Sequence, residues 1–319
     1  MRFASLLMLC ALTSTALSAE FPSKTITMIV PFPPGGGTDI QARPIARALG
    51  EQLGRAVVVD NRPGAGGRIG AGFAARAVPD GHTLLFASVS TLVIEPVLRS
   101  NVGYDPRRDF EPLMVVTEMP FVLIVPASSP AKNLRDLLTQ GRNRSGELTY
   151  ASWGPGSAGH LVGEMLKAEA QVDLVHVPYK GEGPAVMGLL GGQVSMMFIT
   201  TFAGLPHVRA GKARALAVTS PKRLSVLPDV PTFAELGLAS VNLQGWYGFV
   251  VPAKTPPDAV ARLHRELTAV LRSPEFTRLA ESQGATVVAS APETLTQRIR
   301  SESASVASVV RAINLKLDE

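Results

Sequence analysis

The chain has 319 residues, of which 46% are hydrophobic and 18% are charged, a composition typical of a globular protein. Its length predicts two domains and a core large enough to fold without disulfide bonds. The net charge of +5 comes from scattered Lys and Arg residues, with no basic run between aromatic residues, which excludes nucleic acid as an expected partner.

Residues 1–19 have the pattern of a secretory signal peptide. Arg2 gives a basic start, residues 4–17 form an apolar run, and small residues at 18–19 offer a cleavage site. The run is too short to span a bilayer. Cys10, the single cysteine, lies inside this segment, so we expect an exported mature protein without cysteine.

Apolar runs alternate with helical patterns in the first part of the mature chain. Strands are predicted at 24–30, 57–59 and 83–87, and helices at 39–53 and 68–77. The order strand-helix-strand-helix-strand implies a parallel sheet with right-handed crossovers.

The same order returns later, so the chain contains two units that share a plan without sharing a sequence. Strands are predicted at 148–152, 173–177 and 194–199, and helices at 160–170 and 184–190. Residues 183–208 carry no charge, but their prolines and glycines favour a buried helix, a glycine stop and a buried strand over a membrane-spanning helix.

Two apolar stretches, 113–126 and 243–251, are long enough to connect the two units. A chain that leaves the first lobe, builds the second and returns makes the first lobe discontinuous. We therefore predict a first lobe from 20–118 and 243–319, and a second lobe from 119–242. Because two paired crossings form a hinge, the expected fold is α/β with two lobes and a hinged cleft between them.

Loop 33–39 is the first candidate binding site, because it joins a strand to a helix and contains three successive glycines. Backbone N–H groups of glycines approach a ligand closely, and the helix N-terminus adds partial positive charge. This loop therefore suits an anion without help from Arg or Lys, although a plain tight turn is the alternative. Asp39 is expected to cap the helix, since its carboxylate would repel an anion.

Loop 152–157 is the second candidate, again between a strand and a helix. Its serine hydroxyls and free amides suit a carboxylate or a bridging water. Trp153 either stacks on an aromatic ligand or only walls the cleft, and His160 either lines the site or assists packing. Tyr179 either donates its hydroxyl to the ligand or is structural. The glycine loop 61–67 is interpreted as a structural connection, with anion binding as the alternative.

Catalysis has little support in the sequence. The five histidines lack metal-ligand spacing, no Gly-x-Ser-x-Gly elbow occurs, and no cysteine remains as a nucleophile after export. Ser152, His160 and Asp39 supply the residue types of a catalytic triad, but nothing in the sequence supports that geometry. We therefore expect no enzymatic activity, no metal and no cofactor.

Several characteristic motifs occur in order along nearly all of the mature chain, at 29–39, 61–67, 79–85, 176–181, 191–194, 205–208, 215–220 and 227–232. These motifs resemble the Bordetella uptake gene (Bug) family, the extracytoplasmic receptors of tripartite tricarboxylate transporters. The sequence departs from many relatives at Ser195, where they carry Asp, and at Glu95-Pro96, where they carry Asn-Pro. Arg43-Pro44 is also unusual. These departures bear on specificity.

The resemblance implies a type II periplasmic-binding-protein fold in which backbone amides and waters hold a ligand carboxylate. By position, the ligand contacts are expected at Gly35, Gly36, Gly37, Thr38, Asp39, Ser88, Ser90, Ser152, Trp153, Gly156, Ser157, His160, Tyr179 and Gly181.

The resemblance also implies a periplasmic protein that captures a small organic carboxylate for the permease subunits of a tripartite transporter. We expect a monomer. Two other functions use the same cleft: a periplasmic hydrolase or isomerase acting on an organic acid, and a ligand sensor for a membrane kinase. A structural envelope protein is a third alternative, and it predicts neither ligand nor closure.

Overall fold

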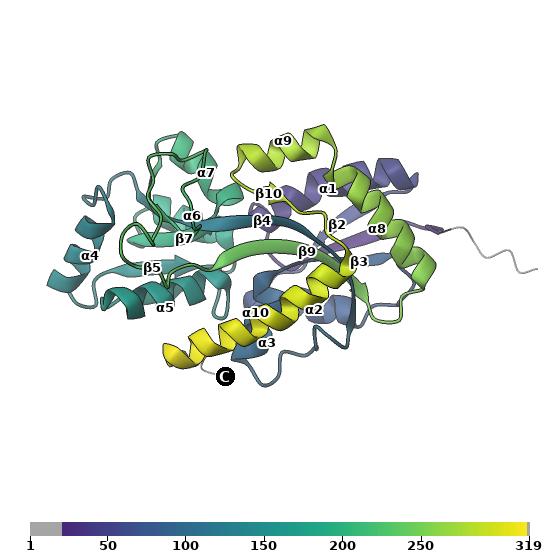
Figure 1. The fold of residues 1–319 in the computed structure, drawn as a ribbon, viewed down its shortest axis with the longest axis horizontal. Coiled ribbons are helices and arrows are strands. Elements are labelled where there is room, and N and C mark those ends of the chain that lie inside the picture. Colours follow the sequence, from purple (N-terminus) through teal and green to yellow (C-terminus); the bar gives the residue numbers. More distant parts are fainter. Residues whose placement is uncertain (1–20, 318–319) are drawn as a thin grey trace, which may run out of the picture.

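The computed structural model describes residues 21–317, so the predicted signal peptide lies outside the described residues (Figure 1). The strands are β1 (Ile26–Val30), β2 (Val57–Asn61), β3 (Thr83–Ser88), β4 (Phe110–Pro126), β5 (Thr149–Ser152), β6 (Val175–Pro178), β7 (Met196–Thr200), β8 (Ala213–Val218), β9 (Gln244–Pro252) and β10 (Thr286–Val287). The helices are α1 (Gly37–Leu53), α2 (Arg68–Ala75), α3 (Glu95–Leu98), α4 (Leu134–Asn143), α5 (Ala158–Ala170), α6 (Glu182–Leu190), α7 (Thr201–Arg209), α8 (Pro257–Leu271), α9 (Pro274–Ser282) and α10 (Pro292–Ala312).

Two parallel three-stranded units form the ends of one sheet, whose order is β2-β1-β3-β9-β4-β7-β5-β6. In one unit β1 pairs in parallel with β2 and β3, and in the other β5 pairs in parallel with β6 and β7. The first strand of each unit is therefore its central strand. Both candidate loops leave the carboxyl end of that central strand, where the strand order reverses and ligands bind in open α/β sheets.

Strands β4 and β9 cross the middle of the molecule and connect the two units (Figure 1). β4 pairs antiparallel with β9 as far as Pro120, and from Phe121 onward it pairs with β7 and β8. β9 also pairs antiparallel with β3. The first half of the molecule is defined as β1–β3, β9 and β10 with their helices, the second half as β5–β8 with theirs, and β4 belongs to both.

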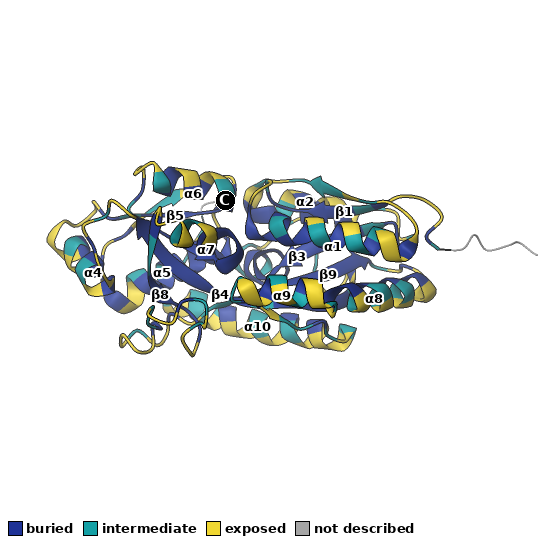
Figure 2. Ribbon diagram, turned by 90° about the horizontal axis from the view of Figure 1, so that it is seen from above, coloured by how far each residue is buried: buried dark blue, intermediate teal, exposed yellow. Residues whose placement is uncertain are grey.

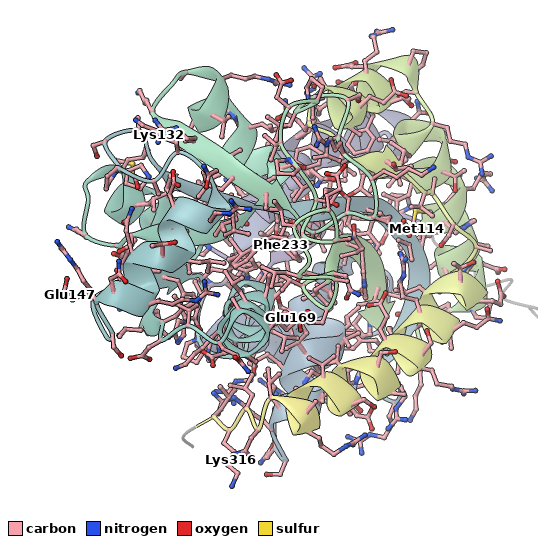
Figure 3. The ribbon with its side chains drawn as sticks, turned by 60° about the vertical axis from the view of Figure 1, so that its left-hand side comes forward. Met114, Lys132, Glu147, Glu169, Phe233 and Lys316 are labelled. Atoms are coloured by element: carbon pink, nitrogen blue, oxygen red, sulfur yellow. The ribbon has the colours of Figure 1, made fainter. Side chains whose placement is uncertain are left out.

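The inner strands of the sheet form the buried interior, and the outer faces of the helices are exposed (Figure 2). α10 shows why such a helix docks, because Leu295, Ile299 and Val306 lie on one helical face and are at most 5% exposed. Burying each of these side chains contributes roughly 1.5–3 kcal/mol. Figure 3 shows Phe233 inside the molecule, with Lys132 projecting from its surface.

The charge-free stretch 183–208 is not a membrane span. Its first part forms α6 and its middle part forms the fully buried strand β7, in agreement with the sequence prediction. Its last part forms nearly all of α7, a helix that the sequence did not predict. Across residues 21–317, no helix combines the length and the apolar character that crossing a membrane requires.

Candidate functional site

A cavity lies where the two halves meet, beside the crossing strands. Counted together with the open solvent at its mouth, the space measures about 390 Å³. Its wall is largely apolar, with hydroxyl groups and one carboxylate set into it, which is the usual character of a small-molecule site. The lining residues are Phe32, Gly36, Thr38, Ser88, Val89, Ser90, Met119, Phe121, Trp153, Ala158, Glu182, Thr200, Gly245, Trp246 and Tyr247.

The glycine loop after β1 approaches the second half so closely at Gly37 that a side chain there would collide with it. The N–H of Gly37, the first residue of α1, donates to Oε2 of Glu182 at 2.7 Å. A Cβ on Gly37 would collide with Thr200 Oγ1 and Tyr247 Oη. The glycine backbone thus approaches an anionic group as expected, but that group is the carboxylate of Glu182 and not a ligand.

Asp39 does not cap α1 as expected. The N-cap is Gly36, which has no side chain, and Asp39 accepts the N–H of Gly35 at 3.1 Å, just before the helix. Its carboxylate also accepts from Asn61 Nδ2 at 3.0 Å and from the Arg43 guanidinium. Burial disfavours ionisation of Asp39, but these donors outweigh it and hold its pKa below the usual value. Asp39 therefore fixes the loop and does not line the cavity.

The loop after β5 leads into α5, which Ser157 caps by accepting the N–H of His160 at 3.3 Å. The N–H of Ala158, the first residue of α5, donates to Ser90 Oγ at 3.0 Å. Ser90 follows β3 in the first half, so this bond crosses the cavity. Both helix N-termini thus meet a side chain of the opposite half, a carboxylate at α1 and a neutral hydroxyl at α5.

Two histidines support the second loop through hydrogen bonds to its residues. Ser152 Oγ lies 2.6 Å from His176 Nε2, and the Gly156 N–H donates to His160 Nδ1 at 3.2 Å. The two imidazole rings stack with centroids 4.0 Å apart. Burial lowers the pKa of His160 and lowers that of His176 to about 3, so both rings are neutral. Neither Ser152 nor His160 contacts Asp39 through a hydrogen bond, and the hypothetical triad does not form.

Glu182 is the principal site residue that the sequence did not single out. It begins α6, is 6% exposed, and accepts hydrogen bonds from Thr200 N at 2.9 Å and Thr200 Oγ1 at 3.1 Å, in addition to Gly37. Burial raises its pKa, and the donated hydrogen bonds oppose that rise. The available signal was a lone carboxylate between Gly181 and Gly183, at a strand-loop-helix junction like the other two.

Glu95 forms a second buried carboxylate between the halves. Its Oε2 accepts from Arg99 Nε at 3.1 Å, with Arg68 Nε at 3.5 Å. A Cβ on either Gly66 or Gly156 would collide with this carboxylate. Burial raises its pKa to about 7 despite the two guanidinium groups. The loop 61–67, interpreted as a structural connection, therefore also contributes to the contact between the halves.

The predicted ligand contacts divide into three groups. Gly36, Thr38, Ser88, Ser90 and Trp153 line the cavity, and Ser88 Oγ is buried without a hydrogen-bond partner. Gly35, Gly37, Asp39, Ser152, Gly156, Ser157 and His160 build the two loops around it.

Tyr179 and Gly181 form the third group, outside the lining. The Tyr179 hydroxyl donates to Gln193 at 3.3 Å, and Gly181 packs against Pro33 of the first loop. A direct ligand role for the Tyr179 hydroxyl therefore has no support in this arrangement. Within residues 21–317, no three His, Cys, Asp or Glu side chains gather as a metal site.

Comparisons with known proteins agree with this architecture. A family model described as the tripartite tricarboxylate transporter family receptor matches residues 41–315. Protein BugT of Bordetella pertussis is 38% identical over 298 residues, which cover 93% of this chain and 91% of BugT.

Two solved structures hold acids. Rpa4515 of R. palustris with adipate has a TM-score of 0.90 at 33% identity, covering 93% of this chain and 99% of that one. MatC of Rhodopseudomonas palustris with bound malate has a TM-score of 0.87 at 33% identity, covering 91% of this chain and all 100% of that one. The periplasmic binding protein BugD has a TM-score of 0.90 at 35% identity, covering 93% of this chain and 99% of that one, which confirms the predicted α/β periplasmic-binding-protein fold.

Proposed function

Because this chain belongs to the tripartite tricarboxylate transporter receptor family, we propose that it captures a small organic carboxylate and delivers it to a membrane permease. The observation that carries this proposal is the cavity between two strand-loop-helix units. It offers the first turn of α5, the unpartnered hydroxyl of Ser88 and an aromatic wall. Relatives that hold adipate and malate on the same fold support the ligand class.

The capture mechanism follows from the connections between the halves. We propose lobes of 20–118 with 243–319, and of 119–242, that move about the two crossing strands where Pro120 pairs with Gln244. The bonds Gly37–Glu182 and Ser90–Ala158 join opposite halves, so they exist only when the halves are together. A ligand that contacts both halves shifts the population toward this closed arrangement.

The setting of this activity is also part of the proposal. Residues 1–19 direct export to the periplasm, where the mature chain acts as a monomer. The closed surface is recognised by membrane permease subunits.

We further propose that the protein binds without turnover. Ser152 and His176 form a close hydroxyl–imidazole pair, but neither lines the cavity. Ser152 instead bonds to the backbone of Gly154 in its own loop. A nucleophile has to reach the ligand, so this pair supports the loop and does not favour hydrolysis.

A thermal-shift screen of refolded, ligand-stripped mature protein tests the proposal. Organic acids are compared with their amides, and a specific acid at about 100–1,000 times its Kd should stabilise the fold by about 3–4 kcal/mol. The amide of that acid should give no shift, because it lacks the anionic group. Stabilisation by neutral sugars or peptides but by no acid would contradict carboxylate capture. Conversion of the bound acid, measured by product analysis, would favour the enzyme alternative.

A further inference from the structure

The N-terminus of α1 already holds a carboxylate. The N–H of Gly37 donates to Glu182 Oε2 at 2.7 Å, and Thr200 supplies a further N–H and a hydroxyl to the same group. Anions bind at helix N-termini because free N–H groups and the helix dipole meet there. Glu182 therefore takes a position in which a second carboxylate of a ligand would otherwise be received.

The other end of the cavity remains neutral. At α5 the amide of Ala158 meets only the hydroxyl of Ser90, and the hydroxyl of Ser88 lines the cavity without a partner. A ligand carboxylate at this end would gain the α5 amide and both hydroxyls. The ligand carboxylate would replace the Ser90 hydroxyl as the acceptor of the Ala158 N–H, and a charged acceptor forms the stronger hydrogen bond.

The wall between these ends is mainly apolar. Phe121 and Trp153 face one another with ring centroids 5.8 Å apart, and further apolar side chains continue the wall. Among residues 21–317, the cavity lining includes no Lys, Arg or His side chain. A second ligand carboxylate would thus meet Glu182 with no cation to offset the repulsion, in a site where burial strengthens electrostatic interactions.

We propose that Glu182 makes the cleft selective for organic acids with one carboxylate on an apolar or aromatic body, and disfavours dicarboxylates. This inference rests on the proposed function and narrows its ligand class. The carboxylate of Glu182 is the specificity-determining group, and the first turn of α5 receives the carboxylate of the ligand.

The hydrogen bonds around Glu182 support its ionised form. Both of its carboxylate oxygens accept from donors, Oε1 from an amide and Oε2 from an amide and a hydroxyl. Burial raises the pKa of Glu182 above its usual value, and the donors from Thr200 and Gly37 lower it only in part. A carboxylate surrounded by donors keeps its charge more readily than one in an apolar pocket.

Matched acid pairs test the proposal on the full mature chain. Hexanoate and adipate share six carbons and differ in the second carboxylate, and benzoate and terephthalate differ in the same way. Isothermal titration calorimetry should give at least tenfold tighter binding of the monocarboxylate in one pair. In Glu182→Gln the ratio within that pair should fall by tenfold or more, because the repelling charge is removed.

Two further variants serve as controls. Glu51→Gln removes the same charge from the exposed far end of α1 and should leave the ratio unchanged. Glu182→Asp keeps the charge and should retain the selectivity, even if Glu182→Gln does not fold.

Three outcomes are decisive. Wild-type protein that binds adipate as tightly as hexanoate, and terephthalate as tightly as benzoate, would overturn the inference and leave carboxylate capture intact. An unchanged ratio in folded Glu182→Gln would do the same. If none of the four acids, nor any other organic acid, binds, carboxylate capture itself fails and the selectivity fails with it.

Discussion

The two loop units have the same topology but are held by opposite chemistry. The loop before α1 is fixed by carboxylates, with Asp39 binding its own backbone and Glu182 reaching across from the other half. The loop before α5 is fixed by neutral groups, with His160 and His176 behind it and the hydroxyl of Ser90 in front. Two equivalent helix N-termini are thus unequal as anion sites, because one already meets a negative charge.

Glu95 is a carboxylate beside the second loop, which is otherwise held by neutral groups. Its substitution is expected to give the largest change in stability among these tests. Its carboxylate packs against Gly156, and burial raises its pKa to about 7. A raised carboxyl pKa favours the protonated folded state, so its contribution to stability is full below the unfolded value of 4.5 and is lost as pH rises through 7. The shift corresponds to about 3 kcal/mol in the free energy of unfolding.

Glu95→Gln should therefore be more stable than wild type at pH 8, by up to about 3 kcal/mol, and should lose this pH dependence. Urea denaturation at pH 5 to 8 measures it. Glu147→Gln, at an exposed glutamate, is the control and should keep the wild-type profile (Figure 3). A Glu95→Gln profile that still falls between pH 5 and 8 as wild type does would show that Glu95 is not the group responsible.

Two neighbouring glycines test the close contact at α1. Gly37→Ala should lower the free energy of unfolding by about 2 kcal/mol, because its Cβ collides with Thr200 and Tyr247. Gly35→Ala should cost about 1 kcal/mol from backbone strain alone, since φ is +84° and no atom lies within 4 Å of the added Cβ. Chemical denaturation compares the two, and equal costs would mean that the contact across the halves contributes nothing.

His176→Phe tests the neutral support of the second loop. The phenyl ring keeps the stacking on His160 but loses the bond to Ser152, which should cost about 1 kcal/mol at pH 7. The lowered pKa of His176 has the opposite sign to that of Glu95. Its contribution is full above the unfolded value of 6.5 and is lost as pH falls toward 3. The variant should therefore lose less stability in acid than wild type, as pH-dependent unfolding would show. An equal or greater loss would mean that this imidazole is not neutral in the fold.

The smallest expected changes in stability are those of alanine substitutions at Ser88 and Ser90, which should differ from each other. Ser88→Ala should change the free energy of unfolding by less than about 0.5 kcal/mol, because its hydroxyl has no partner, and should weaken ligand binding by roughly 5–10-fold. Ser90→Ala should cost about 1 kcal/mol, since it leaves the Ala158 amide without its acceptor. Calorimetry and denaturation on both variants measure the contrast. Unchanged ligand affinity in Ser88→Ala would remove this hydroxyl from the site.

Most of the fold follows from local sequence patterns. Hydrophobic runs of strand length alternate with helical periodicity, so the strands of both units and the helices between them lie close to their predicted positions. The glycine loops and the crossing strands were also visible, because runs of glycine and long apolar stretches are local features. Gly36 and Trp153, which belong to these locally recognisable loops, line the cavity as predicted.

The partners of the polar groups were decided by the tertiary structure. Asp39 is a residue type that commonly caps helices, yet its carboxylate accepts the N–H of Gly35 in the preceding loop. The fold also brings Arg43 and Asn61 within hydrogen-bonding distance of that carboxylate. Glu182 lies 145 positions from Gly37 in the chain, and no local pattern relates the two. Sequence alone thus determined two loops suited to anions. The packing of the halves decided that a carboxylate of the protein itself occupies one of them, because hydrogen bonds between distant residues depend on where the whole chain places them.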